Sequence, residues 1–167
     1  MALAGGELWR LDATAQAALV RRREVSPDEL IDAALARIER LNPRINAVIA
    51  LFPDVARRQA RDPRTRDAPF AGVPMLLKDG VQELAGTPYT LATPLLRDLG
   101  HRSKSTTEFT RRLRRAGFVI LGKTNLPELS SGVTTEPEAF GPTRNPWALD
   151  RTGGGSSGGS AAAVPAR

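Results

Sequence analysis

Apolar side chains recur at helical spacing near the start of the chain and predict two helices. The first is expected over residues 12–23. The second opens at Ser26, with a proline at the first helical position and Glu29 placed to complete a capping box. Its apolar stripe stops at Asn42-Pro43, where we expect the helix to end. Both apolar faces need a surface on which to pack.

Short apolar runs then alternate with helical segments, which is typical of an α/β fold. Extended segments are expected at 46–51, 73–77 and 118–121, and helices at 54–61 and 106–116. In the last of these helices Phe109, Leu113 and Ala116 are expected to point inward, and Gly117 to end it. The run that closes at Leu77 gives way directly to Lys78-Asp79-Gly80. A buried strand delivers a polar group at its carboxyl end in this manner.

The chain changes character after Lys123. Four prolines and scattered glycines interrupt residues 127–146, and little periodicity remains. Loops of this length inside compact proteins are usually functional or disordered. The segment GGGSSGGS then occupies residues 153–160, and a helix is expected to begin at Ala161.

Composition narrows the chemistry. The chain has 167 residues, 41% hydrophobic and 25% charged, which suits one globular domain. It contains no cysteine and one histidine, so disulfides and Cys/His zinc sites are excluded and a Ser-His-Asp triad is disfavoured. No signal peptide or membrane-spanning run is visible, and we therefore expect a cytoplasmic protein without a membrane partner.

The net charge of +6 raises the question of nucleic acid binding. The basic residues cluster in helix-like stretches without interleaved aromatic residues, so we interpret them as solvated helix faces and expect no nucleic acid partner. Of the 24 basic residues only Lys78, Lys104 and Lys123 are lysines. Because a buried lysine can lose its proton and an arginine cannot, these three positions are of interest.

Three interpretations compete for the GGGSSGGS segment. It has the composition of a flexible linker. Gly153, Gly155 and Gly158 also satisfy a dinucleotide-binding pattern, although no strand precedes it. In the third interpretation, glycines allow an unusual backbone that holds a serine beside a substrate. That serine would need a base, for which Lys78 is the candidate.

Four segments taken together resemble the amidase signature family: GVPMLLKD from Gly72, AGFVILGKTNLPE from Ala116, TEPEAFGPTRNPW from Thr135 and GGGSSGGSAAAV from Gly153. Their order and spacing agree with the family over nearly the whole chain. The resemblance implies an α/β fold with a central twisted mixed sheet flanked by helices. It implies a triad of a serine nucleophile, a bridging serine in a cis peptide and a lysine.

By motif, Lys78 matches the family's lysine and Ser156 its bridging serine, with a cis peptide between Gly155 and Ser156. Ser130 and Gly155 match positions at the substrate site, and Lys123 is expected to anchor its loop. A lysine has an ordinary pKa of about 10.4, but burial lowers it enough for Lys78 to accept a proton. The hydroxyl of Ser156 can both donate and accept, so it can relay that proton.

The family pattern continues into a serine nucleophile beyond Arg167, so residues 1–167 are expected to be the N-terminal portion of one domain, truncated after the glycine-serine motif. The resemblance implies an amidase, inactive in this truncated form, with a small-molecule amide substrate and no metal or organic cofactor. The full-length form is expected to be a homodimer. Two alternatives stay open: an A-type subunit of an aminoacyl-tRNA amidotransferase, and a non-catalytic fragment or pseudogene product.

Overall fold

The computed structural model describes residues 5–166, and the chain divides into two compact units. Unit 1 holds the chain up to Glu39, Phe52–Met75 and Arg111–Leu121. Unit 2 holds Arg40–Leu51, Leu76–Thr110 and the chain from Gly122 onward.

The chain mixes helices with strands, as the sequence predicts. The α-helices are α1 (Ala13–Arg21), α2 (Pro27–Ile45), α3 (Pro53–Ala60), α4 (Pro94–Asp98), α5 (Glu108–Arg115) and α6 (Gly158–Ala163). Short 3-10 helices cover Gly5–Arg10, Pro63–Thr65 and Glu128–Ser130. The strands are β1 (Val48–Leu51), β2 (Pro74–Lys78), β3 (Val119–Thr124), β4 (Arg144–Asn145) and β5 (Ala148–Thr152).

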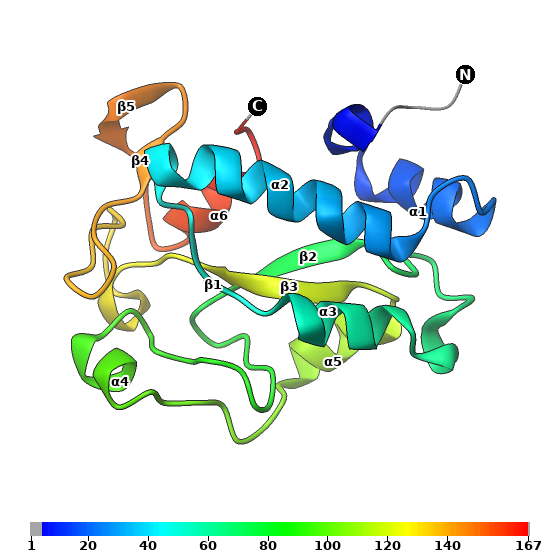
Figure 1. Cartoon of the computed structure of the whole chain (residues 1–167). Coiled ribbons are helices and arrows are strands. Elements are labelled where there is room, and N and C mark those ends of the chain that lie inside the picture. Colours follow the sequence, from blue (N-terminus) through cyan, green and yellow to red (C-terminus); the bar gives the residue numbers. More distant parts are fainter. Residues whose placement is uncertain (1–4, 167) are drawn as a thin grey trace. The chain divides into compact units, whose positions relative to one another are not determined.

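The main sheet has the strand order β1-β3-β2 (Figure 1). Strand β1 is antiparallel to β3, with Ala50 opposite Lys123. Strands β3 and β2 run in the same direction, because Val119 N–H donates to the Val73 carbonyl at one end and Asp79 N–H donates to the Thr124 carbonyl at the other. The sheet is therefore mixed, and the fold class is α/β as expected.

The two N-terminal helices begin as predicted, but α2 ends later. The Ser26 and Glu29 side chains each accept a backbone N–H of the other residue, which is a complete capping box. Helix α2 continues through Pro43 to Ile45, so the predicted end at Asn42-Pro43 is wrong. A proline removes one helical N–H donor and its ring crowds the carbonyl four residues earlier, but Pro43 lies in the last turn, where only two more residues follow in the helix.

Unit 1 has an apolar core in which Leu19, Leu30 and Val73 are almost fully buried. The rings of Phe70 and Phe118 stack beside it with centroids 4.5 Å apart. These residues come from two helices and from the loop segments that lead into β2 and β3, so the core joins segments that are distant in sequence. The apolar faces of α1 and α2 are therefore packed against this core, as their sequence patterns predict.

Helix α5 is oriented differently from the prediction. Phe109 is 51% exposed instead of pointing inward, whereas Thr110 is fully buried. Phe109 and Leu113 are the only apolar residues between Glu108 and Arg115, and two apolar positions are too few for their spacing to define the buried face. Gly117 has φ +100° and ends the helix as predicted, since only glycine adopts that conformation freely.

In unit 2, hydrogen bonds of buried polar side chains hold the long proline-rich segment in place. The Asn125 side chain donates to the Gly141 carbonyl and to Thr143 Oγ1, and Thr143 Oγ1 donates to the Asn46 carbonyl. A β4–β5 hairpin, which the sequence did not predict, follows at once. Within the described residues, no helix has the length and apolar character that crossing a membrane requires.

Candidate active site

Lys78 is the last residue of strand β2, and its backbone is held in place by the turn that follows. Leu77 is fully buried, and because side chains alternate along a strand, Lys78 lies on the opposite face. The Lys78 N–H donates to Gln82 Oε1 at 2.8 Å. The next residue, Asp79, donates its N–H to the Thr124 carbonyl, which fastens the end of β2 to β3. The lysine therefore stands on a fixed strand end.

Ser156 lies in the glycine-rich loop that precedes α6. The peptide bond between Gly155 and Ser156 is cis, as the resemblance implied. A Cβ atom on Gly155 would lie 2.6 Å from the Gly132 carbonyl oxygen, so the backbone of residues 132–134 leaves room only for glycine. Thr135 Oγ1 donates to the Gly154 carbonyl at 2.8 Å. These contacts exclude a flexible linker, because the loop is packed and hydrogen-bonded.

The structure brings Lys78 and Ser156 together. The Lys78 Nζ atom donates to Ser156 Oγ at 2.7 Å. Burial lowers the pKa of Lys78 below its ordinary value, because a charged ammonium loses solvation. A lysine with a lowered pKa spends more time as the neutral amine, which can accept a proton from the hydroxyl. The pair can therefore move a proton between two fixed side chains.

The other predicted substrate-site residues lie near this pair. Ser130 has φ +60° and a buried hydroxyl for which the described residues offer no hydrogen-bond partner. A Cβ atom on Gly80 would lie 2.6 Å from Ser130 Oγ, so this serine packs against the turn after Lys78. Gly155 precedes Ser156 directly. Their roles in substrate binding stay predictions.

A buried ion pair, which the sequence did not predict, lies behind Lys78. Lys123 is fully buried, and its Nζ atom donates to the Gln82 carbonyl and lies 3.5 Å from Asp79 Oδ1. Asp79 Oδ2 accepts from the backbone and the hydroxyl of Thr90. Desolvation raises the pKa of Asp79 and lowers that of Lys123, and their mutual attraction opposes both shifts.

Gln82 connects the ion pair to Lys78. Its side-chain oxygen accepts from the Lys78 backbone, and its main-chain oxygen accepts from Lys123 Nζ. Lys123 therefore anchors the turn that follows β2, in addition to its own strand. The scarcity of lysine and the motif that begins at Ala116 both marked Lys123 in the sequence, whereas no signal marked Gln82.

Within the described residues, the two serines that follow Ser156 make no hydrogen bond to Lys78 or Ser156. Ser157 is the N-cap residue of α6, and its side chain makes no capping hydrogen bond. The Ser160 hydroxyl lies 2.9 Å from Thr124 Oγ1. Across residues 5–166, no three His, Cys, Asp or Glu side chains gather as a metal site requires.

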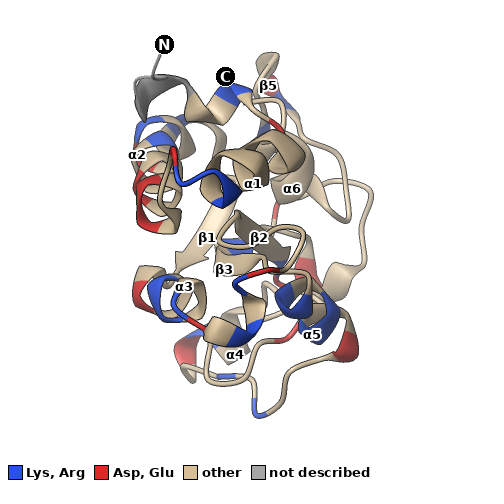
Figure 2. Ribbon diagram, turned by 90° about the vertical axis from the view of Figure 1, so that its right-hand side faces the viewer, with Lys and Arg blue, Asp and Glu red and all other residues tan. Residues whose placement is uncertain are grey.

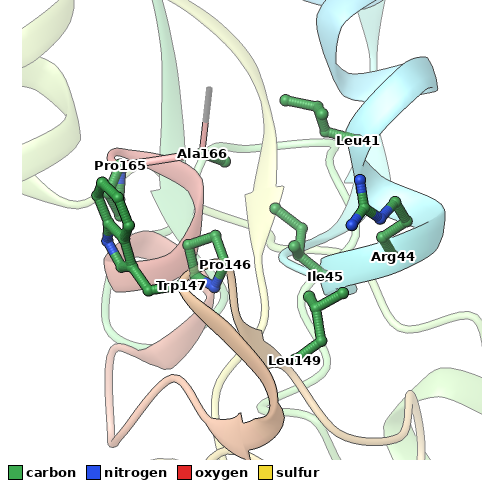
Figure 3. Close-up of a pocket in the computed structure, with 8 residues that line it drawn as sticks. All are labelled: Leu41, Arg44, Ile45, Pro146, Trp147, Leu149, Pro165 and Ala166. Carbon is green, nitrogen blue, oxygen red and sulfur yellow. The ribbon is translucent and has the colours of Figure 1, made fainter.

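A pocket of about 120 Å³ lies elsewhere in unit 2 (Figure 3). Leu41 and Arg44 come from α2, and Trp147 and Leu149 from the β4–β5 hairpin region. In Figure 3 the Trp147 ring lies beside Pro165, and both residues line the pocket. Neither Lys78 nor Ser156 lines it, so it is separate from the candidate active site.

Comparisons with known proteins agree with the motifs. The family model described as amidase matches residues 29–167. The chain is 51% identical to the 6-aminohexanoate-cyclic-dimer hydrolase of Paenarthrobacter ureafaciens, over 96% of this chain and 32% of that protein. It is 44% identical to the A-type subunit of the glutamyl-tRNA(Gln) amidotransferase of Acidothermus cellulolyticus, over 96% of this chain and 32% of the other.

Solved structures of amidase signature enzymes are also similar to this chain. A 6-aminohexanoate cyclic dimer hydrolase complexed with substrate superposes with a TM-score of 0.90 at 51% identity, over 96% of this chain and 32% of that one. A bacterial aryl acylamidase superposes with a TM-score of 0.81 at 34% identity, over 90% of this chain and 32% of the other. The chain thus spans about a third of the length of these relatives. It belongs to the amidase signature family.

Proposed function

We propose that this protein hydrolyses a carboxamide to a carboxylate and ammonia or an amine by a Ser-cisSer-Lys mechanism. Lys78 is the base and Ser156 the bridging serine. The observation that carries the proposal is the 2.7 Å hydrogen bond between Lys78 Nζ and Ser156 Oγ, across the end of a strand and a glycine-rich loop. The lowered pKa of Lys78 supports its role, since only the neutral amine accepts a proton.

The proposed relay balances its protons in each step. A serine nucleophile attacks the amide carbon while its proton passes to Ser156 Oγ, and the Ser156 proton passes to Lys78 Nζ. The carbon–nitrogen bond then breaks as Lys78 returns the proton through Ser156 to the leaving nitrogen. Water hydrolyses the acyl ester by the same route, which regenerates the serine.

The attacking serine is not among the described residues that surround the pair. Within residues 5–166, Lys78 is the hydrogen-bond partner of the Ser156 hydroxyl, and no second serine lies within hydrogen-bonding distance of it. The family resemblance supports a nucleophile, together with its oxyanion-binding amides, beyond Arg167. We therefore propose that residues 1–167 are the N-terminal portion of one amidase-signature domain, and that they alone turn over no amide.

A chimera tests the catalytic proposal. This chain replaces the matching N-terminal part of the Paenarthrobacter ureafaciens hydrolase, to which it is 51% identical. We expect the chimera to hydrolyse the 6-aminohexanoate cyclic dimer, and Ser156→Ala to abolish that activity while Ser157→Ala retains it. The isolated chain should release no product. A folded, inactive chimera would remove the support for catalysis, and turnover by the isolated chain would require a different nucleophile.

An amidotransferase component is the second candidate, because relatives named as the A-type subunit of glutamyl-tRNA(Gln) amidotransferase are 43–45% identical to this chain. A second chimera, built on the Thermobifida fusca relative, separates the candidates. If the second chimera retains a larger fraction of its parent's activity than the hydrolase chimera does of its own parent's, the amidotransferase is favoured. Inactivity in both would favour a non-catalytic fragment.

The proposal also covers the cellular location, the substrate class and the oligomeric state of the full-length protein. We propose a cytoplasmic protein that acts on a small-molecule amide and forms a homodimer when complete. Cell fractionation with an antibody against this chain tests the location. Light scattering of the hydrolase chimera tests the dimer, since a monomer at all accessible concentrations would contradict it.

A further inference from the structure

Unit 1 contains a second hollow, which the proposed catalysis does not use. It has a volume of about 520 Å³ and lies between the end of α3, the loop around Pro63–Thr65 and helix α5. Four arginines line it: Arg64, Arg111, Arg114 and Arg115. Figure 2 shows the blue of the arginines along α5.

Asp62, the one acidic residue in the lining, forms an ion pair with Arg64. Both carboxylate oxygens of Asp62 accept hydrogen bonds from Arg64, at distances from 2.7 to 3.2 Å. The hydrogen bonds from Arg64 lower the pKa of Asp62 from 3.8 to about 2, so the carboxylate stays charged. Three further guanidinium groups, all from α5, line the same hollow, so cationic groups outnumber the single acid in its wall.

Two uncharged residues of the lining add an amide donor and an apolar surface. Gln59 also lines the hollow. Its side-chain oxygen accepts the Ile120 N–H, and its side-chain NH2 group is a hydrogen-bond donor. Phe118 also lines the hollow and is stacked against Phe70, so its ring is held in a fixed position. The hollow therefore combines cationic donors with a rigid aromatic surface.

Helix stability alone does not account for this arrangement. Arginines in the last turn of α5 complement the negative end of the helix dipole, and that explains basic residues at this end. It does not explain Arg64, which comes from a separate loop, or the hollow that the two segments enclose. Arginines from different segments that line one hollow suit an oxyanion, because guanidinium groups bind phosphate oxygens bidentately.

We propose that this hollow binds a small organic molecule that carries a phosphoryl group. A phosphoryl group with nearly two negative charges matches several arginines better than a single carboxylate does. The volume of about 520 Å³ exceeds what an inorganic phosphate fills, and Phe118 offers a surface for the organic part. The site is separate from Lys78 and Ser156, so the proposal does not depend on the catalytic one.

Calorimetric titration of the unchanged chain provides the first test, with phenyl phosphate, inorganic pyrophosphate and acetate at one ionic strength. Phenyl phosphate should bind at least about 10-fold more tightly than acetate. Equal affinities would overturn the proposal. Binding of pyrophosphate without phenyl phosphate would overturn the organic part of the assignment, and tighter binding of a short single-stranded oligonucleotide would overturn the small-molecule class.

Paired variants provide the second test. Arg111→Gln with Arg114→Gln should weaken phenyl phosphate binding at least about 10-fold, through the loss of charge-assisted hydrogen bonds. The matched control removes the same charge from neighbouring positions outside the lining, Arg112→Gln with Arg58→Gln, and should weaken binding less than about 2-fold. Equal weakening in both pairs would show general charge attraction and overturn the site.

Discussion

The Nζ atom of Lys78 lies 2.7 Å from the Oγ atom of Ser156, although 78 positions of sequence separate the two residues. One group stands at the end of a strand whose following turn is hydrogen-bonded to it. The other stands in a loop that Thr135 fixes through the Gly154 carbonyl. Neither group needs a moving segment to reach its partner, so the hydrogen-bonded pair on which the proposed relay depends is already formed in this structure.

Replacement of Lys78 tests the relay in the hydrolase chimera. We expect Lys78→Met to lower kcat/KM by about 100- to 10,000-fold, the usual contribution of a general base. The control is Lys104→Met, which removes the same charge from an exposed loop and should leave kcat/KM unchanged. Near-normal rates for Lys78→Met would remove this residue from the base role.

The pKa of Lys78 predicts a pH dependence. Burial lowers it from the ordinary value of 10.5, so between the folded value and 10.5 the unfolded chain binds more protons than the folded one. The contribution of Lys78 to the free energy of unfolding therefore rises with pH in that window. Competitive acetylation read by mass spectrometry should show half-maximal reactivity of Lys78 below pH 10.5, and hydrolysis by the chimera should rise over the same range. A midpoint at or above 10.5 would contradict the burial argument.

The ion pair behind the site predicts a stability effect. Lys123→Met leaves the buried Asp79 carboxylate without its cation, and breaking a buried pair in this way costs about 3–5 kcal/mol. Urea denaturation of the chain measures the loss. The double variant Lys123→Met with Asp79→Asn removes the unpaired charge and should recover part of the stability. A double variant as unstable as the single one, or more so, would mean that packing rather than charge dominates.

Asp62 predicts how acid affects unit 1. Its pKa is lowered to about 2, so its bonds to Arg64 stabilise the fold above the ordinary value of 3.8 and are lost as the pH falls toward 2. Asp62→Asn keeps one oxygen for the Arg64 backbone N–H, removes the charge and replaces the second carboxylate oxygen, an acceptor for the Arg64 guanidinium, with an NH2 group. The melting temperature of this variant should lie below that of the unchanged chain near neutral pH, and the two should converge as the pH approaches 2. A constant difference at every pH would exclude the charge as its cause.

Local signals in the sequence predicted local structure well. The capping box at Ser26 and the terminal Gly117 each depend on a few neighbouring residues, and both are present. Pro43 was misjudged because its cost depends on its distance from the helix end, which the apolar stripe does not reveal. The β4–β5 hairpin was missed because its strands are short and carry no alternating pattern.

In the candidate site, too, some residues could be predicted from the sequence and others could not. Motif resemblance pointed to Lys78 and Ser156, and the structure joins them by a hydrogen bond. Periodicity could not have paired them, because no local pattern links a strand end to a loop so far along the chain. Lys123 and Gln82 depend on contacts between β3 and the turn after β2, which only the folded chain defines.

The complete burial of Lys123 makes it a natural reporter of opening. A lysine-specific protease can cut after Lys104 on the surface, but it reaches the bond after Lys123 only when the sheet comes apart and the ammonium group leaves Asp79 and the Gln82 carbonyl. The two cleavage rates, measured in one digestion, therefore separate local loop motion from opening of the interior. The scarcity of lysine leaves few other cuts to confuse the pattern.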